Sequence, residues 1–241
     1  MAGLKLLTLN IEGDRHLARV REVIAAHSPD IVCLQEVFES DCATLAAAGD
    51  YDARFGISLR MPRGSAPARD WGVAVLTRVP VRRQELIYYT DALPIREFVE
   101  PNDARRLALV TELEHFGREY RIVATHFTWS PDGHANDEQR ADFARLKQVL
   151  ARYPHYALCG DFNAPRGREM FAKFTAELRL IDHLPPDVTT TLDPQFHRMK
   201  STLELVVDTV FSTPHYAAAD VRLLEGVSDH KGILTTLERR G

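Results

Sequence analysis

The sequence predicts an α/β domain with β-sheets in its interior and helices on its outside. Short apolar runs of strand length are separated, at intervals, by segments in which apolar residues recur at helical spacing. Elements that alternate in this way pack in layers around a core. No repeat, low-complexity segment or linker divides the 241 residues, and a chain of this length can bury a sizeable core. We therefore expect one domain over residues 1–241.

The predicted elements follow one another in a regular order. Strands are expected over residues 4–9, 31–37, 51–57, 71–77, 81–88, 106–110, 120–125, 156–158, 203–211, 221–224 and 233–237. Helices are expected over residues 17–25, 44–48, 143–150 and 171–180. Asp14 is the expected N-cap of the first helix, and Pro29 lies just beyond its end. The strands on either side of Pro80 are interpreted as a pair, and those on either side of Gly117 as a hairpin.

Composition and charge restrict the class of protein. Hydrophobic residues make up 45% of the chain, and the net charge of −4 provides no overall basic field for nucleic acid. No apolar run is long enough to span a membrane, and Asn10 and Glu12 interrupt the first run too early for a signal peptide. Cys33, Cys42 and Cys159 lack metal-binding spacing, which favours free thiols in a reducing compartment. We expect a cytoplasmic monomer.

Asp161 and Asn163 leave the end of a short buried strand. Alternation along an extended chain points both side chains the same way. A carboxylate beside a carboxamide can hold a water molecule and steady an oxyanion or a metal ligand. The same pattern is also a common turn signal, so it does not identify a site by itself.

Other polar residues recur at the ends of predicted strands. They are Asn10, Glu36, His126, Asp229 and His230. Asp208 interrupts an apolar strand, and a buried carboxylate needs a partner, which a histidine could provide. Taken singly, these residues have structural alternatives as helix caps, turn residues or packed histidines. Their joint occurrence at strand ends favours one shared site.

These residues lie in short segments that resemble the motifs of the endonuclease/exonuclease/phosphatase superfamily, the DNase I-like metal-dependent phosphodiesterases and phosphatases. The segments are Leu9-Asn10-Ile11, Leu34-Gln35-Glu36, Thr125-His126-Phe127, Gly160-Asp161-Phe162-Asn163, Val207-Asp208-Thr209-Val210-Phe211 and Ser228-Asp229-His230. They stand in the family's order and span nearly the whole chain. The resemblance implies a four-layer α/β/β/α sandwich, in which two mixed β-sheets pack face to face with helices on both outer faces.

The resemblance also implies a divalent metal ion, usually Mg²⁺, which Mn²⁺ can replace. A hard cation prefers oxygen ligands and keeps several waters. Glu36 is expected to be the central ligand, with Asn10 and Asp229 beside it, directly or through a water molecule. Glu12 stands where some relatives carry a second acid and is a weaker candidate.

The implied reaction is hydrolysis at phosphorus by in-line attack of water. Asp161 is expected to orient or deprotonate the water, and Asn163 to steady the water or a phosphate oxygen. His230 is expected to contact the phosphate as a cation that Asp208 stabilises. His126 is expected to be a second phosphate contact or an acid near the leaving group.

The resemblance leaves the substrate open, because the family cleaves DNA, RNA, phosphoinositides, sphingomyelin and small phosphodiesters. Arg106 resembles a family position near the phosphate, and Trp129 could stack on a base or another ring. We expect a metal-dependent phosphodiesterase or nuclease whose partner is nucleic acid or a small phosphodiester. The alternatives are a phosphomonoesterase acting on a sugar, lipid headgroup or nucleotide, and a non-catalytic binding member of the fold.

Two segments outside the motifs are expected to be irregular. Residues 59–70 are rich in arginine, proline and glycine, which indicates either a solvated surface loop or a clamp for the substrate. Residues 189–200, which include His197 and Arg198, are expected to overhang the site and to help set its specificity.

Overall fold

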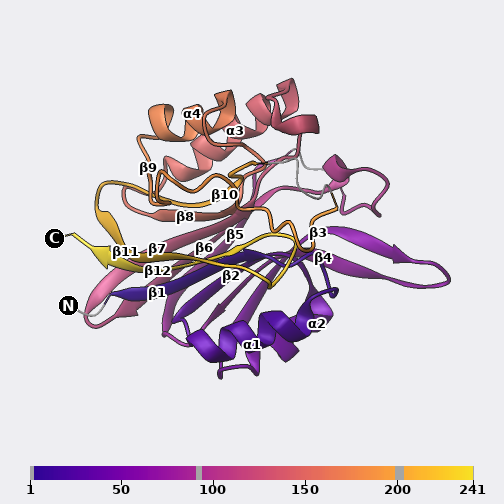
Figure 1. The fold of residues 1–241 in the computed structure, drawn as a ribbon, viewed down its shortest axis with the longest axis horizontal. Coiled ribbons are helices and arrows are strands. Elements are labelled where there is room, and N and C mark those ends of the chain that lie inside the picture. Colours follow the sequence, from indigo (N-terminus) through magenta and orange to yellow (C-terminus); the bar gives the residue numbers. More distant parts are fainter. Residues whose placement is uncertain (1–2, 91–93, 199–203, 241) are drawn as a thin grey trace.

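The protein forms a four-layer α/β/β/α sandwich. In the computed structural model, which describes residues 3–90, 94–198 and 204–240, two mixed six-stranded sheets pack face to face (Figure 1). Helices α1 (Leu17–His27) and α2 (Glu39–Ala46) cover the outer face of one sheet. Helices α3 (Asp137–Leu150) and α4 (Glu169–Glu177) cover the outer face of the other. This architecture confirms the expected fold.

The first sheet has the strand order β11-β12-β1-β2-β4-β3. Its strands are β1 (Leu4–Asn10), β2 (Ile31–Phe38), β3 (Asp52–Arg63), β4 (Ala66–Thr77), β11 (Tyr216–Leu224) and β12 (Gly232–Arg239). Strands β1 and β2 run parallel because α1 carries the chain back between them, and the other neighbouring pairs are antiparallel.

The second sheet repeats this plan, with the strand order β5-β6-β7-β8-β10-β9. Its strands are β5 (Val81–Tyr88), β6 (Leu107–His115), β7 (Arg118–His126), β8 (Ala157–Asp161), β9 (Ile181–Asp182) and β10 (Asp208–Ser212). Strands β7 and β8 run parallel because α3 connects them. Short 3₁₀ helices, η1 (Pro101–Asp103) and η2 (Pro131–Gly133), lie in two of the connections. Each sheet therefore has one parallel strand pair near its centre.

Apolar residues fill three layers between these elements. The central layer lies between the sheets and includes Leu6 from β1 and Leu109 from β6. One outer layer joins α1 and α2 to the first sheet through residues such as Ile24, and the other joins α3 and α4 to the second through residues such as Phe174. Burial of this apolar surface is the main force that holds the four layers together. All three cysteines are buried free thiols.

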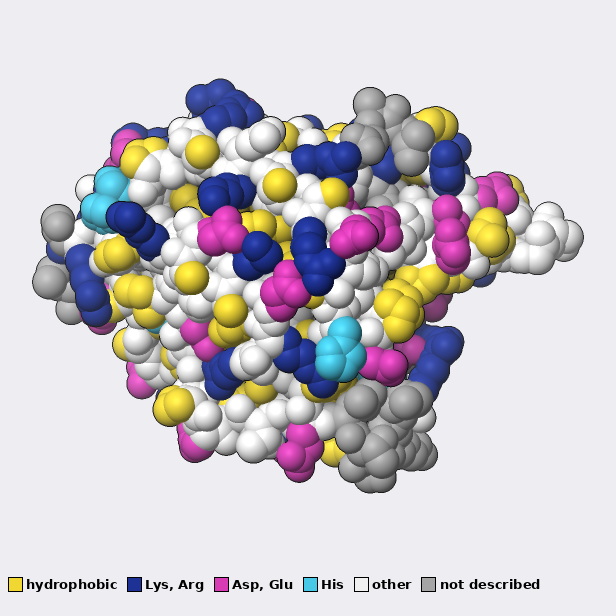
Figure 2. All heavy atoms as spheres, turned by 90° about the horizontal axis from the view of Figure 1, so that it is seen from above, with side chains coloured by type: hydrophobic (Ala, Val, Ile, Leu, Met, Phe, Trp, Pro, Cys, Tyr) yellow, Lys and Arg dark blue, Asp and Glu magenta, His cyan; other side chains and the backbone are white. Residues whose placement is uncertain are grey.

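The outer surface over α3 and α4 carries interspersed basic and acidic side chains (Figure 2). Arg140 of α3 pairs with Glu169 of α4 at 2.7 Å, and Lys147 pairs with Glu177 at the same distance. Among the described residues, no helix is both long and apolar enough to cross a membrane.

Some element boundaries differ from the sequence-based predictions. The N-cap of α1 is His16 rather than Asp14, because the Asp14 carboxylate pairs instead with Arg69 at 2.6 Å. Helix α2 begins earlier than predicted. Strand β10 begins at Asp208 rather than at residue 203, which lies outside the described residues. The backbone N–H of Val207 donates to the Thr191 hydroxyl, so the residues before Asp208 pair with a connecting segment instead of extending the strand.

The predicted pairing of the strands on either side of Pro80 is wrong. Strand β4 pairs with β2 and β3 in the first sheet, whereas β5 pairs with β6 in the second. The chain crosses between the sheets at this proline, which cannot donate a ladder hydrogen bond. The predicted hairpin at Gly117 is correct, since β6 and β7 are antiparallel neighbours.

Residues 59–70 form a β-hairpin rather than the predicted loop. Strands β3 and β4 continue into this segment and project from the body of the protein (Figure 1). Arg60 pairs with Asp70 at 3.1 Å, and Arg69 pairs with Asp41 at 2.7 Å, so neighbouring carboxylates engage two of the arginines. The hairpin is therefore a poor clamp for an anionic polymer.

We expect Phe174→Ala to destabilise the protein by about 3–5 kcal/mol. Phe174 is fully buried, and its ring lies 5.0–5.4 Å from the rings of Phe127, Phe143 and Phe162. Truncation would leave a cavity between α4 and the second sheet. The same substitution at Phe116, which is 73% exposed, should change the free energy of unfolding by less than about 0.5 kcal/mol. Urea denaturation of both variants measures the difference, and similar costs would contradict the description of this layer.

Candidate active site

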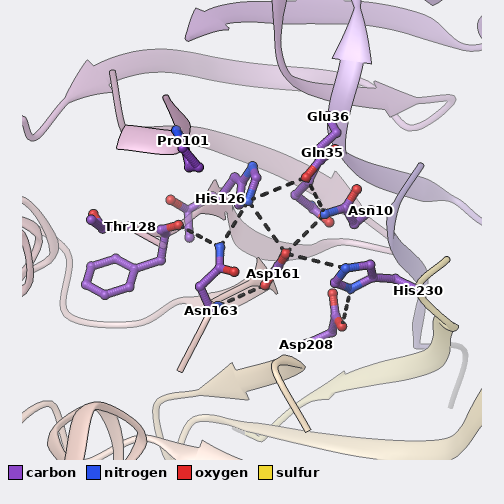
Figure 3. Close-up of polar contacts among 12 residues, drawn as sticks. Asn10, Gln35, Glu36, Pro101, His126, Thr128, Asp161, Asn163, Asp208 and His230 are labelled. Carbon is purple, nitrogen blue, oxygen red and sulfur yellow. Dashed lines mark hydrogen bonds and ion pairs between the residues drawn. The ribbon is translucent and has the colours of Figure 1, made fainter. Parts of the chain in front are cut away.

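The predicted site residues meet at one edge of the sandwich. Asn10, His126 and Asp161 are the last residues of β1, β7 and β8. Parallel strands end at the same edge of a sheet, so each central strand pair delivers polar residues to one place. A hydrogen bond of 3.0 Å from Nδ2 of Asn10 to Oδ2 of Asp161 connects the edges of the two sheets (Figure 3).

The register of the second sheet aligns three predicted site residues. His126 lies opposite Asp161 on the neighbouring strand, and Asp161 lies opposite Asp208 on the next. Gly160 permits this arrangement, since it has a φ of +143° and a Cβ there would lie 1.9 Å from the carbonyl oxygen of Thr125. A side chain at this position would force β7 and β8 apart, so the close approach of the two strands requires a glycine here.

Glu36 reaches the site through an irregularity in β2. The register of β2 against β4 shifts between Gln35 and Val37, and Glu36 has a φ of +58°, which is rare for a residue with a side chain. Its Oε1 atom accepts a hydrogen bond of 3.0 Å from Nδ2 of Asn10 (Figure 3). The strand continues to Phe38, so a bulge, rather than the predicted strand end, aims this carboxylate.

Asp161 is a buried carboxylate held from two sides. Asn10 donates to its Oδ2 atom, and the backbone N–H of Asn163 donates to Oδ1 at 2.8 Å. Burial raises the pKa of Asp161, and repulsion from the Asp208 carboxylate adds to the rise, which brings the pKa to about 7. The group can therefore exchange a proton near neutral pH.

Asn163 and His126 form a second pair beside Asp161. Nδ2 of Asn163 donates to the backbone oxygen of Phe127 at 3.0 Å and lies 3.1 Å from Nε2 of His126. That Nε2 atom also lies 3.5 Å from Oδ2 of Asp161. Burial lowers the pKa of His126 well below its usual value, and the positive charge of Arg106 contributes to the decrease. The lowered pKa favours the neutral ring, which can serve as a hydrogen-bonding group.

His230 and Asp208 form a buried ion pair, as predicted. Nδ1 of His230 lies 2.8 Å from Oδ2 of Asp208, and its Nε2 lies 3.9 Å from Oδ2 of Asp161. Burial alone would lower the pKa of His230, but attraction to Asp208, together with Asp161 and Asp229, outweighs burial and holds the pKa well above its usual value. The raised pKa favours the imidazolium form, in which Nδ1–H donates to Asp208 and Nε2 lies on the side of Asp161.

The donor atoms at this edge suit a divalent cation. One ligand atom each from Glu36, His126 and Asp161 lies within 4.8 Å of the others, and Asp229 lines the same cleft. Burial raises the pKa of Glu36, and the Asp229 carboxylate adds to the rise although a hydrogen bond from Asn10 opposes it. A bound cation would relieve this crowding of negative charge, and carboxylate oxygens are the ligands that hard cations prefer.

The site lies in a cleft of about 510 Å³, which Arg106 and Trp129 also line. Arg106 is 3% exposed; its Nη2 donates to the Pro101 carbonyl at 3.1 Å and to Oδ1 of Asn102 at 3.2 Å. Its Nε has no hydrogen-bond partner among the described residues. Trp129 is 40% exposed. A buried cation and an exposed ring therefore both face the cleft.

The segment over residues 189–198 contributes to the cleft, as expected; residues 199 and 200 lie outside the described residues. His197 lines the cleft with its ring 6.3 Å from that of His230. The neighbouring Phe196 ring packs 4.9 Å from that of His16 and beneath the Arg19 guanidinium, which anchors the segment to α1.

The weaker ligand candidate, Glu12, is engaged outside the cleft. Its carboxylate pairs with Arg15 at 2.8 Å and with His16 at 3.2 Å. Arg198 lies 3.9 Å from the oxygen that Arg15 contacts. Two arginines already lie beside this carboxylate, so we do not place it among the metal ligands.

Sequence reasoning did not identify several apolar residues that line the cleft. They are Leu59, Met61, Trp71, Phe98, Leu192, Leu205 and Val207. The signal for the first two was the alternation of Leu59 and Met61 with charged Arg60, which the prediction of a loop over this segment concealed. Phe98 belongs to no regular element and carries no pattern.

Comparison with known proteins agrees with this geometry. The family model described as the Endonuclease/Exonuclease/phosphatase family matches residues 7–230. No curated protein matches the chain. An endonuclease/exonuclease/phosphatase from Beutenbergia cavernae is similar with a TM-score of 0.77 and 20% identity, over 100% of this chain and 72% of that one.

Two further solved structures share the fold at low sequence identity. The human Nocturnin catalytic domain with bound sulfate has a TM-score of 0.72 and 20% identity, over 99% of this chain and 94% of that one. Sphingomyelinase C from Streptomyces griseocarneus has a TM-score of 0.68 and 19% identity, over 98% of this chain and 99% of that one. Since the family model spans nearly the whole chain, including every residue of the candidate site, the protein belongs to the endonuclease/exonuclease/phosphatase family.

Proposed function

We propose that the protein is a divalent-metal-dependent hydrolase of phosphodiester bonds, in which water attacks phosphorus in line with the leaving oxygen. One observation carries the proposal: a proton acceptor, Asp161, and a cation, His230, face each other at 3.9 Å in a cleft that also contains Glu36. A base for water and a positive group for the phosphate are what hydrolysis at phosphorus needs. The family's members are hydrolytic phosphoesterases, which supports the same chemistry.

Glu36 and Asp229 are the acids that would hold the metal ion, for which we propose Mg²⁺ with Mn²⁺ as a substitute. Asn10 presents its Nδ2 to Glu36 while its Oδ1 accepts from the Glu12 N–H, so it would stand beside the ion rather than bind it directly. When bound, the ion supplies positive charge that neutralises the charge developing on the leaving oxygen. Asn10 also fixes the distance between two acids, since its amide donates to both Glu36 and Asp161.

Asp161 and Asn163 form the side of the site that would receive water. Both oxygens of Asp161 accept hydrogen bonds, from Asn10 and from the backbone of Asn163, so the carboxylate is held in one orientation. From there Asp161 would orient the water and accept its proton. The Asn163 amide, fixed by Phe127, would hold the water or a phosphate oxygen in place.

His230 and Arg106 supply positive charge for the phosphate. Asp208 binds Nδ1 of His230, so its Nε2–H remains available to donate to a phosphate oxygen. Arg106 is buried and faces the same cleft, and its Nε has no hydrogen-bond partner in the part of the chain that the structure describes. His126, being neutral, would contact the substrate by a hydrogen bond rather than supply a proton.

The charge of the cleft favours a diester over a monoester. Among the described residues, Arg106 is the single arginine or lysine that lines it. A monoester is a dianion near neutral pH and needs more positive charge than a diester monoanion. A phosphomonoesterase, the alternative that the sequence left open, therefore fits this cleft less well.

We expect the protein to hydrolyse bis(p-nitrophenyl) phosphate with Mg²⁺ or Mn²⁺, faster than p-nitrophenyl phosphate, and to lose this activity in EDTA. Glu36→Gln should reduce the rate about a hundred- to thousandfold, because it removes the central metal ligand while keeping the shape of the side chain. Release of p-nitrophenol measures the rates, and circular dichroism checks that the variant is folded.

Glu169→Gln is the matched control for that experiment. Glu169 is an exposed acid of α4 that pairs with Arg140 and does not line the cleft, so the variant should retain the parent rate. A Glu36→Gln rate equal to that of the parent, or activity that persists in EDTA, would show the metal assignment to be wrong. Faster hydrolysis of the monoester would favour the phosphomonoesterase.

We expect Asp208→Asn to lower kcat about 10²- to 10⁴-fold, because His230 would lose the carboxylate that keeps it cationic and oriented. The double variant Asp208→Asn/His230→Ala should be little slower than His230→Ala alone, since the two residues act as a unit. Asp182→Asn, on the neighbouring strand β9, should keep the parent kcat. Steady-state kinetics of the four variants measures these kcat values. If the loss of kcat in the double variant equals the product of the losses in the two single variants, Asp208 and His230 do not act as a pair.

A further inference from the structure

Part of the cleft is lined by apolar residues. Five of them, Leu59, Met61, Trp71, Phe98 and Trp129, are here called the apolar wall. Leu59 and Trp71 are buried, whereas Phe98 is 37% and Trp129 is 40% exposed. Hydrophobic side chains gather beside the base of the hairpin that projects on the right of Figure 2. Exposed apolar surface gathered in a cleft marks a ligand-binding site more often than a structural one.

Backbone pairing holds the apolar wall in place. Leu59 and Met61 alternate with Arg60 in β3, so both lie on the same face of the strand. Arg60 donates through its backbone to the Arg96 carbonyl and accepts from the Phe98 N–H, both at 2.8 Å. These bonds place Phe98 beside β3 as though it continued the sheet. The surface is therefore formed before any ligand binds.

The apolar wall begins next to the groups that would contact the phosphate. The Trp71 ring lies 5.7 Å from that of His126. At the other end, Asn102 donates to the Trp129 carbonyl at 3.1 Å and accepts from Arg106 at 3.2 Å. A phosphate held by His126 and Arg106 would therefore place its ester substituent along these rings.

The surroundings of the apolar wall do not suit a polynucleotide. A nucleic-acid strand is held by basic residues that follow its phosphates. Arg106 is the one arginine or lysine of the cleft in the described parts of the chain, and the acid Asp132 also lines it. Two of the three arginines of the hairpin, Arg60 and Arg69, are paired with carboxylates. The cleft thus offers one phosphate position with apolar surface beside it.

We propose that the apolar wall binds an apolar substituent of a small phosphodiester, so that the substrate carries an aromatic ring or a hydrocarbon chain on one ester oxygen. This inference rests on the proposed phosphodiesterase function. The volume of about 510 Å³ lies within the range of small-molecule sites. Trp129 and Phe98, the most exposed members, are the residues that would touch the substituent.

Three diesters with alkoxide leaving groups of similar basicity test the inference: dimethyl, hexyl methyl and 2-phenylethyl methyl phosphate. With Mg²⁺ or Mn²⁺, we expect kcat/KM, followed by ³¹P NMR, to be at least about tenfold higher for one of the larger diesters than for dimethyl phosphate. Preference for 2-phenylethyl over hexyl would indicate an aromatic substituent, and the reverse order a hydrocarbon chain. Either result supports an apolar subsite.

Variants connect that preference to the apolar wall. Trp129→Ala and Phe98→Ala should each lower the ratio of kcat/KM between the preferred diester and dimethyl phosphate, by up to about tenfold. Phe116→Ala, which removes an exposed ring elsewhere on the surface, should leave the ratio unchanged. A preference that survives both wall variants would overturn the inference.

Binding provides a measurement that does not depend on hydrolysis. Diphenylphosphinate and dimethylphosphinate are monoanions without an ester bond, and calorimetry should show the diphenyl compound binding at least about tenfold more tightly, with the advantage reduced in Trp129→Ala. Equal binding of the two phosphinates and equal kcat/KM for the three diesters would overturn this inference alone. Failure to hydrolyse any diester would overturn the proposed function, and this inference with it.

Discussion

The site depends on the way two parallel strand pairs end. Helices α1 and α3 each return the chain so that a second strand lies parallel to the first, which sends β1 with β2 and β7 with β8 to one edge of the sandwich. The central apolar layer then holds the two edges against each other. The Asn10 amide, which donates to Glu36 of its own sheet and Asp161 of the other, can make both bonds only while this packing persists.

The closeness of the acidic side chains at this edge has an electrostatic consequence. Carboxylates brought together in a buried place repel one another, and burial penalises each of them, which is why the pKa of Asp161 rises to about 7 and that of Glu36 also rises. Asp208, together with Asp161 and Asp229, raises the pKa of His230, so one crowded arrangement places a carboxylate able to accept a proton beside a histidine that favours its charged form. A general base must be able to accept a proton, whereas a cationic phosphate contact must keep its proton. One cluster of acids favours both properties.

The sequence predicted the layers and the clustered polar residues because both follow from local pattern and ordered motifs. A histidine partner for Asp208 was predicted for a physical reason, since a buried carboxylate needs a partner, and the family resemblance named that histidine as His230. The bulge that directs Glu36 into the site was not predicted, because a single residue with positive φ does not change the hydrophobic periodicity of the sequence. The crossing at Pro80, where β4 and β5 join different sheets, was not predicted either. A proline indicates that a strand ends, but which strands pair depends on the packing of the whole fold.

The proposed chemistry and the proposed recognition of the substrate lie on different parts of the chain. Much of the polar cluster stands on the parallel strands and on β10, where a shift of one residue would disturb the register that aligns His126, Asp161 and Asp208. The apolar wall stands on the projecting hairpin and on connecting segments, which can vary without moving that register. On the two proposals made above, substrate preference can change while the reacting groups stay fixed: the family motifs bear on the reaction, whereas Phe98 and Trp129 would bear on which ester is hydrolysed.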